Sequence, residues 1–414
     1  MNIIVIGGGA AGMMAAAQAA MCGASVTLIE KNEKTGKKIY ITGKGRCNVT
    51  NDCSEAELLE NVVRNPRFLY SAVNSFNSED LKNYIEANGV PLKVERGNRV
   101  FPVSDKSSDI IKALNRGMEN AGVKVLLNTE VKRLIIDNCS ACGVLTSRGE
   151  MRADAVILTT GGCSYPQTGS DGKGFELARQ AGHTVTKLTP ALVPINTSDS
   201  FLPELQGLSL KNVRLCAQKG KKLLFSQQGE MLFTHFGISG PLVLTMSSTV
   251  PCELISELDV YIDLKPALSM EQLDSRIIKD MLSCGNKRFK NSLTGLAPSA
   301  LQGVLVSLSG IDPNKRADQL SREERTRLAS LFKHFTLNVS SFRGFNEAII
   351  TRGGVELKEI NSSTMESKIT KGLYFAGEML DTDAFTGGFN LQIAFSTGYL
   401  AGVSAAQSIG GYNG

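Results

Sequence analysis

The first thirty residues alternate between apolar runs and glycines in a pattern that predicts a strand, a turn, a helix and a second strand. Residues 2–6 are nearly all apolar, as in a strand buried within a parallel sheet. The glycine-rich residues 7–12 predict a turn, the alanine-rich stretch 13–22 a helix, and residues 25–29 the next strand. This β-α-β order favours an α/β fold built on a parallel sheet.

The same alternation continues over about the first 190 residues. Apolar positions recur at helical spacing within 55–88 and again within 109–120. Short apolar runs at 124–127 and 155–159 predict strands, and a further helix is expected over 175–181. We predict one α/β unit for this part of the chain.

The pattern changes after residue 190. Short β-like runs at 213–217, 223–226 and 231–234 are separated by turn-forming residues, including Gln228 and Gly229. Helical spacing returns over 269–334, where Ser321 begins a capping-box sequence, and one strand is expected at 336–342. The chain then closes with a strand, a glycine-rich turn and a final helix.

These changes divide the chain into three predicted domains. The α/β domain is discontinuous and comprises residues 1–190 and 343–414. Residues 191–266 and 335–342 form a small β domain, and residues 267–334 form a helical domain.

Composition narrows the class of protein. Of 414 residues, 42% are hydrophobic and 21% are charged, as in ordinary globular proteins and unlike disordered ones. No apolar stretch approaches the roughly 18 residues that a membrane helix needs. Lys and Arg exceed Asp and Glu by only 5 over the whole chain, so we expect neither a membrane nor a nucleic-acid partner.

The cysteines indicate a reducing compartment. There are nine, scattered along a chain that begins with an apolar strand instead of a signal peptide, so we expect a cytoplasmic protein. The close pair Cys139 and Cys142 is interpreted as turn residues. With three histidines and no second cysteine pair, no metal site is expected.

Gly7, Gly9 and Gly12 have the G-x-G-x-x-G spacing directly after a strand and at the start of a helix, the context in which this motif binds a dinucleotide. The glycines allow a tight turn, close approach of a pyrophosphate, and close packing of helix on strand. Glu30, at the end of the second strand, is placed to accept hydrogen bonds from a ribose and would repel a 2′-phosphate. The pattern therefore indicates FAD or NAD in this site and excludes NADP.

The last 65 residues favour FAD over NAD. An extended FAD needs the chain to return late in the sequence to hold the ribityl and flavin ends, and residues 373–378 form a predicted strand that runs into Gly377 and Glu378. Asp381 follows closely. Gly388 then opens a helix whose N-terminal amides are expected to face the flavin C2 carbonyl and to stabilise reduced flavin.

Two further segments are expected beside the cofactor. Residues 36–51 are dense in glycine, cations and amides, and Arg46 and Asn48 are expected to supply charge and hydrogen bonds. Residues 159–174 place Thr160 directly after a strand. The alternatives are a solvated basic loop for the first segment and a structural crossover loop for the second.

These motifs resemble those of a bacterial family of three-domain flavoproteins that includes aminoacetone oxidase and the bile-acid enzyme BaiN. The likeness is carried by the glycine-rich opening, by residues 43–51, by residues 233–241 and by residues 375–392, and it spans nearly the whole chain. It implies a split Rossmann-like FAD domain of glutathione-reductase type, an inserted β-barrel-like domain and a small helical domain.

The predicted FAD site gathers residues from both ends of the chain. We expect noncovalently bound FAD to contact Gly7, Gly9, Ala10, Ala11, Gly12, Glu30, Lys31, Lys37, Arg46, Cys47, Asn48, Val131, Thr160, Gly161, Gly377, Glu378, Asp381, Gly388, Phe389, Asn390 and Leu391.

Three residues are candidates for catalysis. His235 is interpreted either as an acid that works near neutral pH or as a packed structural histidine. Tyr165 and Arg46 are candidates for proton donation or for binding a carboxylate. Cys47 and Cys163 have no partner thiol nearby in the sequence, which argues against disulfide chemistry.

We expect an FAD-dependent oxidoreductase that passes hydride between flavin N5 and a small organic molecule. The resemblance implies reduction of a double bond conjugated to a ketone, of the 3-oxo bile-acid or steroid type, with NADH or NADPH as donor. Its alternative is oxidation of an amine of the aminoacetone type by oxygen. A flavin-bound redox sensor or partner-binding module without turnover is a third hypothesis.

Overall fold

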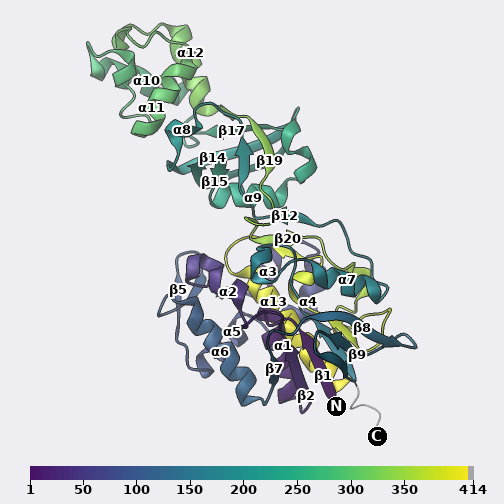
Figure 1. Cartoon of the computed structure of the whole chain (residues 1–414). Coiled ribbons are helices and arrows are strands. Elements are labelled where there is room, and N and C mark those ends of the chain that lie inside the picture. The colour runs from purple at the N-terminus through teal and green to yellow at the C-terminus, as the bar shows by residue number, and fades with distance from the viewer. Residues whose placement is uncertain (409–414) are drawn as a thin grey trace. The chain divides into compact units, whose positions relative to one another are not determined.

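The computed structural model describes residues 1–408, and the chain divides into two compact units (Figure 1). Unit 1 comprises Met1–Ala191 and Phe345–Gly414, and unit 2 is the insertion Leu192–Gly344. The last six residues of the predicted segment 343–414 lie outside the described residues. The division of the chain into three domains stays a prediction.

Unit 1 is built on a five-stranded parallel sheet. Its order is β21 (Leu373–Phe375), β11 (Ala155–Leu158), β1 (Asn2–Ile6), β2 (Ser25–Ile29) and β7 (Lys124–Leu126). The central strands are nearly continuous apolar runs because a parallel sheet is covered on both faces. Since β21 pairs with β11, the end of the chain completes the sheet that its beginning starts, and the predicted α/β fold is confirmed.

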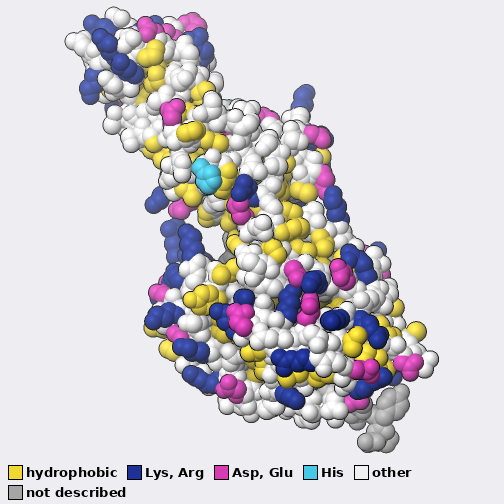
Figure 2. Space-filling model, in the orientation of Figure 1, with side chains coloured by type: hydrophobic (Ala, Val, Ile, Leu, Met, Phe, Trp, Pro, Cys, Tyr) yellow, Lys and Arg dark blue, Asp and Glu magenta, His cyan; other side chains and the backbone are white. Residues whose placement is uncertain are grey.

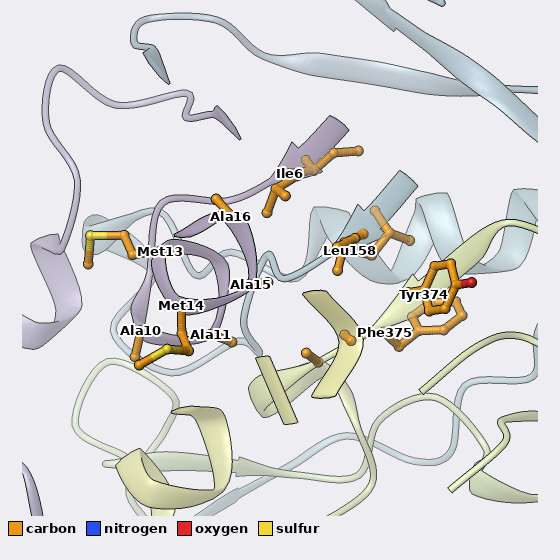
Figure 3. Packing of buried hydrophobic residues seen from close by; sticks show 14 of the residues in the cluster. Ile6, Ala10, Ala11, Met13, Met14, Ala15, Ala16, Leu158, Tyr374 and Phe375 are labelled. Atoms are coloured by element: carbon orange, nitrogen blue, oxygen red, sulfur yellow. The ribbon is translucent and has the colours of Figure 1, made fainter. Parts of the chain in front are cut away.

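Two long helices lie against each other beside this sheet. Helix α1 (Ala10–Met21) is buried over almost its whole length, and α13 (Phe389–Gln407) packs on it through glycines. A Cβ at Gly398 would lie 2.4 Å from the main-chain oxygen of Ala11, so only glycine allows this approach. Figure 3 shows the side chains of α1 among those of β1, β11 and β21. The small residues of α1 therefore reflect burial on several sides.

Shorter elements complete unit 1. The other helices are α2 (Lys37–Ile41), α3 (Glu55–Glu60), α4 (Tyr70–Ser75), α5 (Ser78–Ala87), α6 (Ser107–Asn120) and α7 (Lys173–Gln180). The other strands are β3 (Thr50–Asn51), β4 (Val62–Arg64), β5 (Leu92–Glu95), β6 (Arg99–Pro102), β8 (Val131–Asp137), β9 (Ser140–Thr146), β10 (Gly149–Arg152), β12 (Thr189–Ala191), β20 (Ile350–Arg352) and β22 (Asp383–Ala384).

Two local predictions in unit 1 are wrong. The helical spacing read across 55–88 is broken by β4, which pairs with β22 from the far end of the chain. Of the cysteine pair, Cys139 does lie in the turn between β8 and β9, but Cys142 lies within β9. The partner of β4 lies far along the chain, whereas β9 pairs with its sequence neighbours β8 and β10, so only the first error follows from a remote pairing.

Unit 2 contains a seven-stranded antiparallel sheet. Its order is β18 (Phe335–Leu337), β17 (Asp259–Asp263), β14 (Ser209–Lys219), β15 (Lys222–Thr234), β16 (Gly237–Ser239), β13 (Ile195–Thr197) and β19 (Val339–Phe342). The strand predicted at 336–342 is therefore two strands, which lie at opposite ends of this order.

The turn predicted at Gln228 and Gly229 is also wrong, because both residues lie inside the long strand β15. Gly229 pairs with Val213 next to a register shift in the ladder. A Cβ on Gly229 would lie 3.1 Å from the side chain of Leu242 in α9 (Pro241–Thr249), which packs on β15. The glycine thus gives room to a helix and does not end the strand.

The helices of unit 2 share a hydrophobic cluster with its sheet. They are α8 (Leu202–Leu205), α9, α10 (Met270–Cys284), α11 (Ser299–Ser309) and α12 (Arg322–Lys333). Ser321 caps α12 through the predicted capping box, in which its side chain and that of Glu324 each bond the other's main chain. None of the helices formed by residues 1–408 has the length and apolar character needed to cross a membrane.

Candidate functional site

A cavity in unit 1 opens at the carboxyl ends of the parallel strands. The residues that follow β1, β2 and β11 line it together with the first turns of α1 and α13. Ligands of open α/β sheets bind at this edge because the loops that follow the strands, and the helix N-termini, converge there. The cavity is therefore the candidate binding site.

The glycines of the turn after β1 have different structural roles. Gly7 has φ +106°, and a Cβ on it would lie 2.6 Å from the main-chain oxygen of Thr159 in the neighbouring loop. A Cβ on Gly12 would lie 1.8 Å from the oxygen of Gly7, so Gly12 serves packing and does not line the cavity. A Cβ on Gly9 would meet nothing within 4 Å, which leaves this main chain open to a ligand.

Glu30 is held in place at the end of β2. Its Oε2 accepts a hydrogen bond from the Gly8 amide at 2.7 Å, and its Oε1 accepts from the amide and the side chain of Asn32 at 2.8 and 2.7 Å. An ionised carboxylate has about four acceptor sites, so it keeps capacity for ribose hydroxyls. Asn32 lines the cavity but was not predicted from the sequence. Its only signal there was a side-chain amide two residues after Glu30.

A second polar cluster on the cavity wall joins distant segments. Lys38 Nζ lies 2.5 Å from Glu378 Oε2 and 3.0 Å from Ser164 Oγ. Ser164 Oγ donates to Glu378 Oε1 at 2.6 Å, and the Thr351 amide donates to the same oxygen at 2.8 Å. Sequence reasoning named Glu378 and Lys37 but missed Lys38, because its partner lies 340 residues away.

The structure brings most of the predicted FAD residues together around the cavity. Those that line it are Gly7, Gly9, Ala10, Ala11, Glu30, Lys31, Lys37, Val131, Thr160, Gly161, Gly377, Glu378, Asn390 and Leu391. The remaining seven do not: Gly12, Arg46, Cys47, Asn48, Asp381, Gly388 and Phe389. Contact of the first group with FAD stays a prediction.

Arg46 is engaged elsewhere. Its guanidinium lies 2.5 Å from Glu95 and from Asp105, and it stacks 4.2 Å from the ring centre of Phe101. Hydrogen bonds to Glu95 and then to Asp105 raise the pKa of Arg46 above its usual range. The positive charge of Arg46, which was predicted to contact the cofactor, is therefore paired with these two carboxylates.

The other predicted FAD residues that do not line the cavity are held by packing or by hydrogen bonds to other polar groups. Cys47 is fully buried, and burial raises the pKa of its thiol to about 12, which makes it a poor nucleophile. A Cβ on Gly388 would lie 2.4 Å from the main chain of Thr50, so this glycine serves contact with β3. Asp381 accepts hydrogen bonds from Arg64 and from Thr186, each at 3.2 Å.

Phe389 and Asn48 are the last two predicted FAD residues that do not line the cavity. Phe389 belongs to a small hydrophobic cluster that includes Val62 and Leu69. The buried Asn48 Oδ1 has no hydrogen-bond partner. Neither side chain reaches the cavity wall.

A buried acid lies next to the cavity wall. Thr382 lines the cavity, and its buried hydroxyl has no hydrogen-bond partner. The neighbouring Asp383 is fully buried, and its nearest cation, Arg352, lies 3.7 Å away. Burial raises the pKa of Asp383 to about 6, against the attraction of Arg352 and then Arg64.

The remaining catalytic candidates lie in different units. His235 occupies the turn between β15 and β16 in unit 2, exposed and edge-on to Phe236 at 5.0 Å, so its alternative as a packed histidine is wrong. Tyr165, in unit 1, follows Ser164 with φ +53° and donates its amide to the Phe345 oxygen at 2.9 Å. Burial raises the pKa of its hydroxyl.

The cavity fits an FAD molecule. The open main chain at Gly9 and the free amides in the first turn of α1 suit a pyrophosphate. Glu30 suits the adenosine ribose. The unpartnered hydroxyl of Thr382 is a buried polar group that a ribityl chain could satisfy.

Comparison with known proteins agrees with this geometry. The family model described as "HI0933-like protein Rossmann domain" matches residues 1–404. The 3-dehydro-bile acid delta(4,6)-reductase of Clostridium scindens is 33% identical over 98% of this chain and 99% of its own. The ribosomal RNA dihydrouridine synthase of Haemophilus influenzae is 32% identical over 98% of each chain.

The fold recurs in a solved structure. The 3-ketosteroid-delta4-(5alpha)-dehydrogenase of Rhodococcus jostii matches with a TM-score of 0.53 at 17% identity, over 98% of this chain and 96% of that one. The family model and the two full-length relatives decide the assignment. This chain belongs to the HI0933-like family and is an FAD-dependent oxidoreductase with a Rossmann-like FAD-binding domain.

Proposed function

We propose that this protein reduces a carbon–carbon double bond conjugated to a carbonyl group. The observation that carries the proposal is that two relatives, matched over 98% of the chain, are named for this one kind of reaction on different molecules. A 3-dehydro bile acid with Δ4,6 unsaturation has its double bonds conjugated to a ketone. Uridine likewise has its ring double bond conjugated to a carbonyl.

The proposed overall reaction consumes one NADH or NADPH and one proton and yields the saturated bond and the oxidised nicotinamide. FAD, when bound, would accept two electrons as hydride from the nicotinamide and release them to the substrate. The sequence contains no second G-x-G-x-x-G after a strand, so the nicotinamide would bind without a Rossmann domain of its own.

The residues of unit 1 would hold the cofactor. The amides of the first turn of α1 would bind the pyrophosphate, with the helix dipole adding to the attraction. Glu30, fixed by Gly8 and Asn32, would accept the ribose hydroxyls. Lys38 and Glu378 place an ion pair on the same wall, so the cavity gains a cation without a net charge.

Tyr165 is our candidate for donating the proton that completes the reduction. Its hydroxyl has no hydrogen-bond partner among residues 1–408, and a tyrosine hydroxyl is protonated at neutral pH because its ordinary pKa is about 10. Its left-handed backbone is costly for a tyrosine and is maintained by its surroundings, as at many functional positions. Arg46 is a weaker candidate because two carboxylates already engage it.

Anaerobic stopped-flow absorbance tests the proposal. The holoenzyme is mixed with NADH or NADPH until the visible flavin band bleaches, and then with a Δ4,6-3-oxo steroid, with uridine-containing RNA, or with a saturated 3-oxo steroid as control. We expect a conjugated substrate, and not the saturated one, to restore the band. Tyr165→Phe should bleach normally but slow this second step about 100-fold or more, the usual contribution of a general acid.

Other outcomes would overturn the proposal. Bleaching by an amine such as aminoacetone, followed by rapid reoxidation in air, would identify an amine oxidase. Failure of every donor to reduce the flavin at a useful rate would favour the redox sensor or partner-binding module.

A further inference from the structure

Three consecutive residues at the cavity wall carry buried polar groups that the described chain does not satisfy. Asp381, Thr382 and Asp383 are each at most 4% exposed. Four of their side-chain oxygens have no hydrogen-bond partner among residues 1–408: one of Asp381, that of Thr382 and both of Asp383. Because the large majority of buried side-chain polar atoms in folded proteins are hydrogen-bonded, this concentration marks a functional position.

The fold fixes this segment next to the cavity. Thr382 lines the cavity, and Asp383 begins β22, in which it pairs with Arg64 of β4. The Ala384 amide donates to Asn390 Oδ1 at 2.9 Å, and Asn390 Nδ2 donates to the Ala384 oxygen at 2.7 Å. Asn390 lies in the first turn of α13 and also lines the cavity. The residues on both sides of Asp383 are therefore anchored to the cavity wall.

This wall is placed for the flavin end of an FAD molecule. Glu30 suits the adenosine ribose, and the open main chain at Gly9 suits the pyrophosphate. An extended FAD then has the wall formed by residues 377–394 left for its ribityl chain and its flavin. The buried acid would therefore lie close to the part of the cofactor that carries the electrons.

The charges around Asp383 set the pH at which it loses its proton. Figure 2 shows surface acids, many of them beside Lys and Arg, whereas Asp383 is 0% exposed. Arg352 of β20 lies 3.7 Å away, and Arg64 of β4 is shared with Asp381. Helix α13, which also packs on β22, contains no Asp, Glu, Lys, Arg or His. Burial raises the pKa of Asp383 to about 6, against the attraction of Arg352 and then Arg64. Repulsion by Asp381 adds to the rise.

Reduction of a flavin beside this carboxyl group changes the balance. A hydride carries two electrons and one proton, so a neutral flavin that accepts a hydride gains one negative charge. A negative charge close to a buried carboxylate disfavours its ionised form and raises its pKa. Water and salt screen this repulsion little in a buried site. Since Asp383 already titrates near neutral pH, the added repulsion favours its protonation there.

We infer that Asp383 takes up a proton from solvent when FAD in the cavity is reduced and returns it when the flavin is reoxidised. The hydride passes from a donor such as reduced nicotinamide to the flavin, and the proton binds a carboxylate oxygen of Asp383. Flavin and Asp383 together carry one negative charge before this step and one after it, so no second buried charge is created. The inference requires FAD in the cavity but neither the proposed reaction nor a particular substrate.

Spectroelectrochemical titration of the holoenzyme tests the inference without any substrate. The midpoint potential of the flavin is measured from pH 5 to 8 for wild type and for Asp383→Asn, which keeps the shape of the side chain but cannot titrate. The matched control is Asp199→Asn, which changes a buried acid of unit 2 that accepts hydrogen bonds from Asn338. One extra proton taken up per two electrons changes the equilibrium constant for reduction tenfold per pH unit, which is about 30 mV.

We expect the potentials of wild type and Asp383→Asn to run parallel near pH 5, where Asp383 is protonated in both redox states, and to diverge above pH 6. There the wild-type equilibrium constant should fall about 3- to 10-fold more steeply per pH unit, or about 15–30 mV. Asp199→Asn should follow wild type. An effect of packing alone would shift the potential by the same amount at every pH.

Parallel lines for wild type and Asp383→Asn over the whole pH range would overturn the inference, whether or not they are offset. Arg64→Gln provides a second test if Asp383→Asn does not retain FAD. Removing this partly exposed cation raises the pKa of Asp383 further, so the steep region should begin at higher pH; an unchanged onset would also overturn the inference. Because no nicotinamide or enone is present, failure of the proposed reductase reaction would leave these results unaffected.

Discussion

Replacing Gly12 and Gly9 separately by alanine tests why glycines begin α1. A Cβ on Gly12 would lie 1.8 Å from the Gly7 oxygen and 2.5 Å from Thr159 Oγ1. Neither atom can retreat easily, because Thr159 Oγ1 donates to the oxygens of Ile6 and Gly7 at 2.8 and 3.0 Å. A Cβ on Gly9 would have no neighbour within 4 Å.

The two substitutions should therefore act on different properties. Overpacking in a dense core costs about 1–3 kcal/mol, and disturbing the two Thr159 hydrogen bonds adds about 1 kcal/mol each. We expect Gly12→Ala to lower the free energy of unfolding by about 3–5 kcal/mol. Gly9 has φ −85° and ψ −168°, which alanine also adopts, so Gly9→Ala should leave that free energy within about 1 kcal/mol of wild type.

Urea unfolding of the apoproteins and fluorescence titration with FAD measure the two effects. Gly9→Ala should bind FAD at least about 10-fold more weakly, a cost of about 1.4 kcal/mol, because its methyl group would occupy the approach of the pyrophosphate. If Gly12→Ala is as stable as wild type, the packing argument is refuted. If Gly9→Ala binds FAD with unchanged affinity, the placement of the pyrophosphate is refuted.

Three further predictions concern single side chains. Glu30→Ala should weaken FAD binding about 10- to 100-fold, because hydrogen bonds to a charged group are worth about 1.5–3 kcal/mol; unchanged FAD content after dialysis would contradict this. Since the pKa of Asp383 rises from 3.8 to about 6 on folding, the folded state binds the extra proton and wild-type stability should fall by about 3 kcal/mol as pH rises through that interval. Asp383→Asn should flatten this decline in urea unfolding between pH 4 and 7, and parallel profiles would show that Asp383 does not titrate there. Because His235 is exposed, His235→Ala should keep the FAD content and the unfolding free energy within about 0.5 kcal/mol, so slower turnover alone would indicate catalysis and lost FAD a structural role.

Reasoning from residue patterns identified the core of unit 1 and the cavity edge. Continuous apolar runs, a glycine turn and an alanine-rich helix predicted β1, α1 and β2, because parallel strands covered on both faces leave that pattern in adjacent residues. The spacing of Gly7, Gly9 and Gly12 carried information about main-chain geometry alone. Glu30 followed from its place at the end of β2.

The tertiary structure alone decided which nearby motif residues reach the cavity. Arg46 lies in a cation-rich segment that resembles a cofactor loop, yet its guanidinium binds Glu95 and Asp105, which lie 49 and 59 residues further along the chain. Lys38 lines the cavity, where it pairs with Glu378, a residue 340 positions away in the sequence. These outcomes depend on pairings between remote segments, for which a local pattern contains no signal.

Features that depend on neighbouring residues could be predicted from the sequence, whereas features that depend on the packing of remote segments could not. Patterns in neighbouring residues were enough to predict the α/β class, the glycine turn after β1 and the cap of α12 at Ser321, since each depends on a few adjacent residues and their allowed main-chain angles. Only the folded chain placed Arg288 opposite Arg316, broke the helical run at β4 and buried Asp383 beside Thr382. Charge proximity and burial are set by distances in space, and those follow from how remote segments pack.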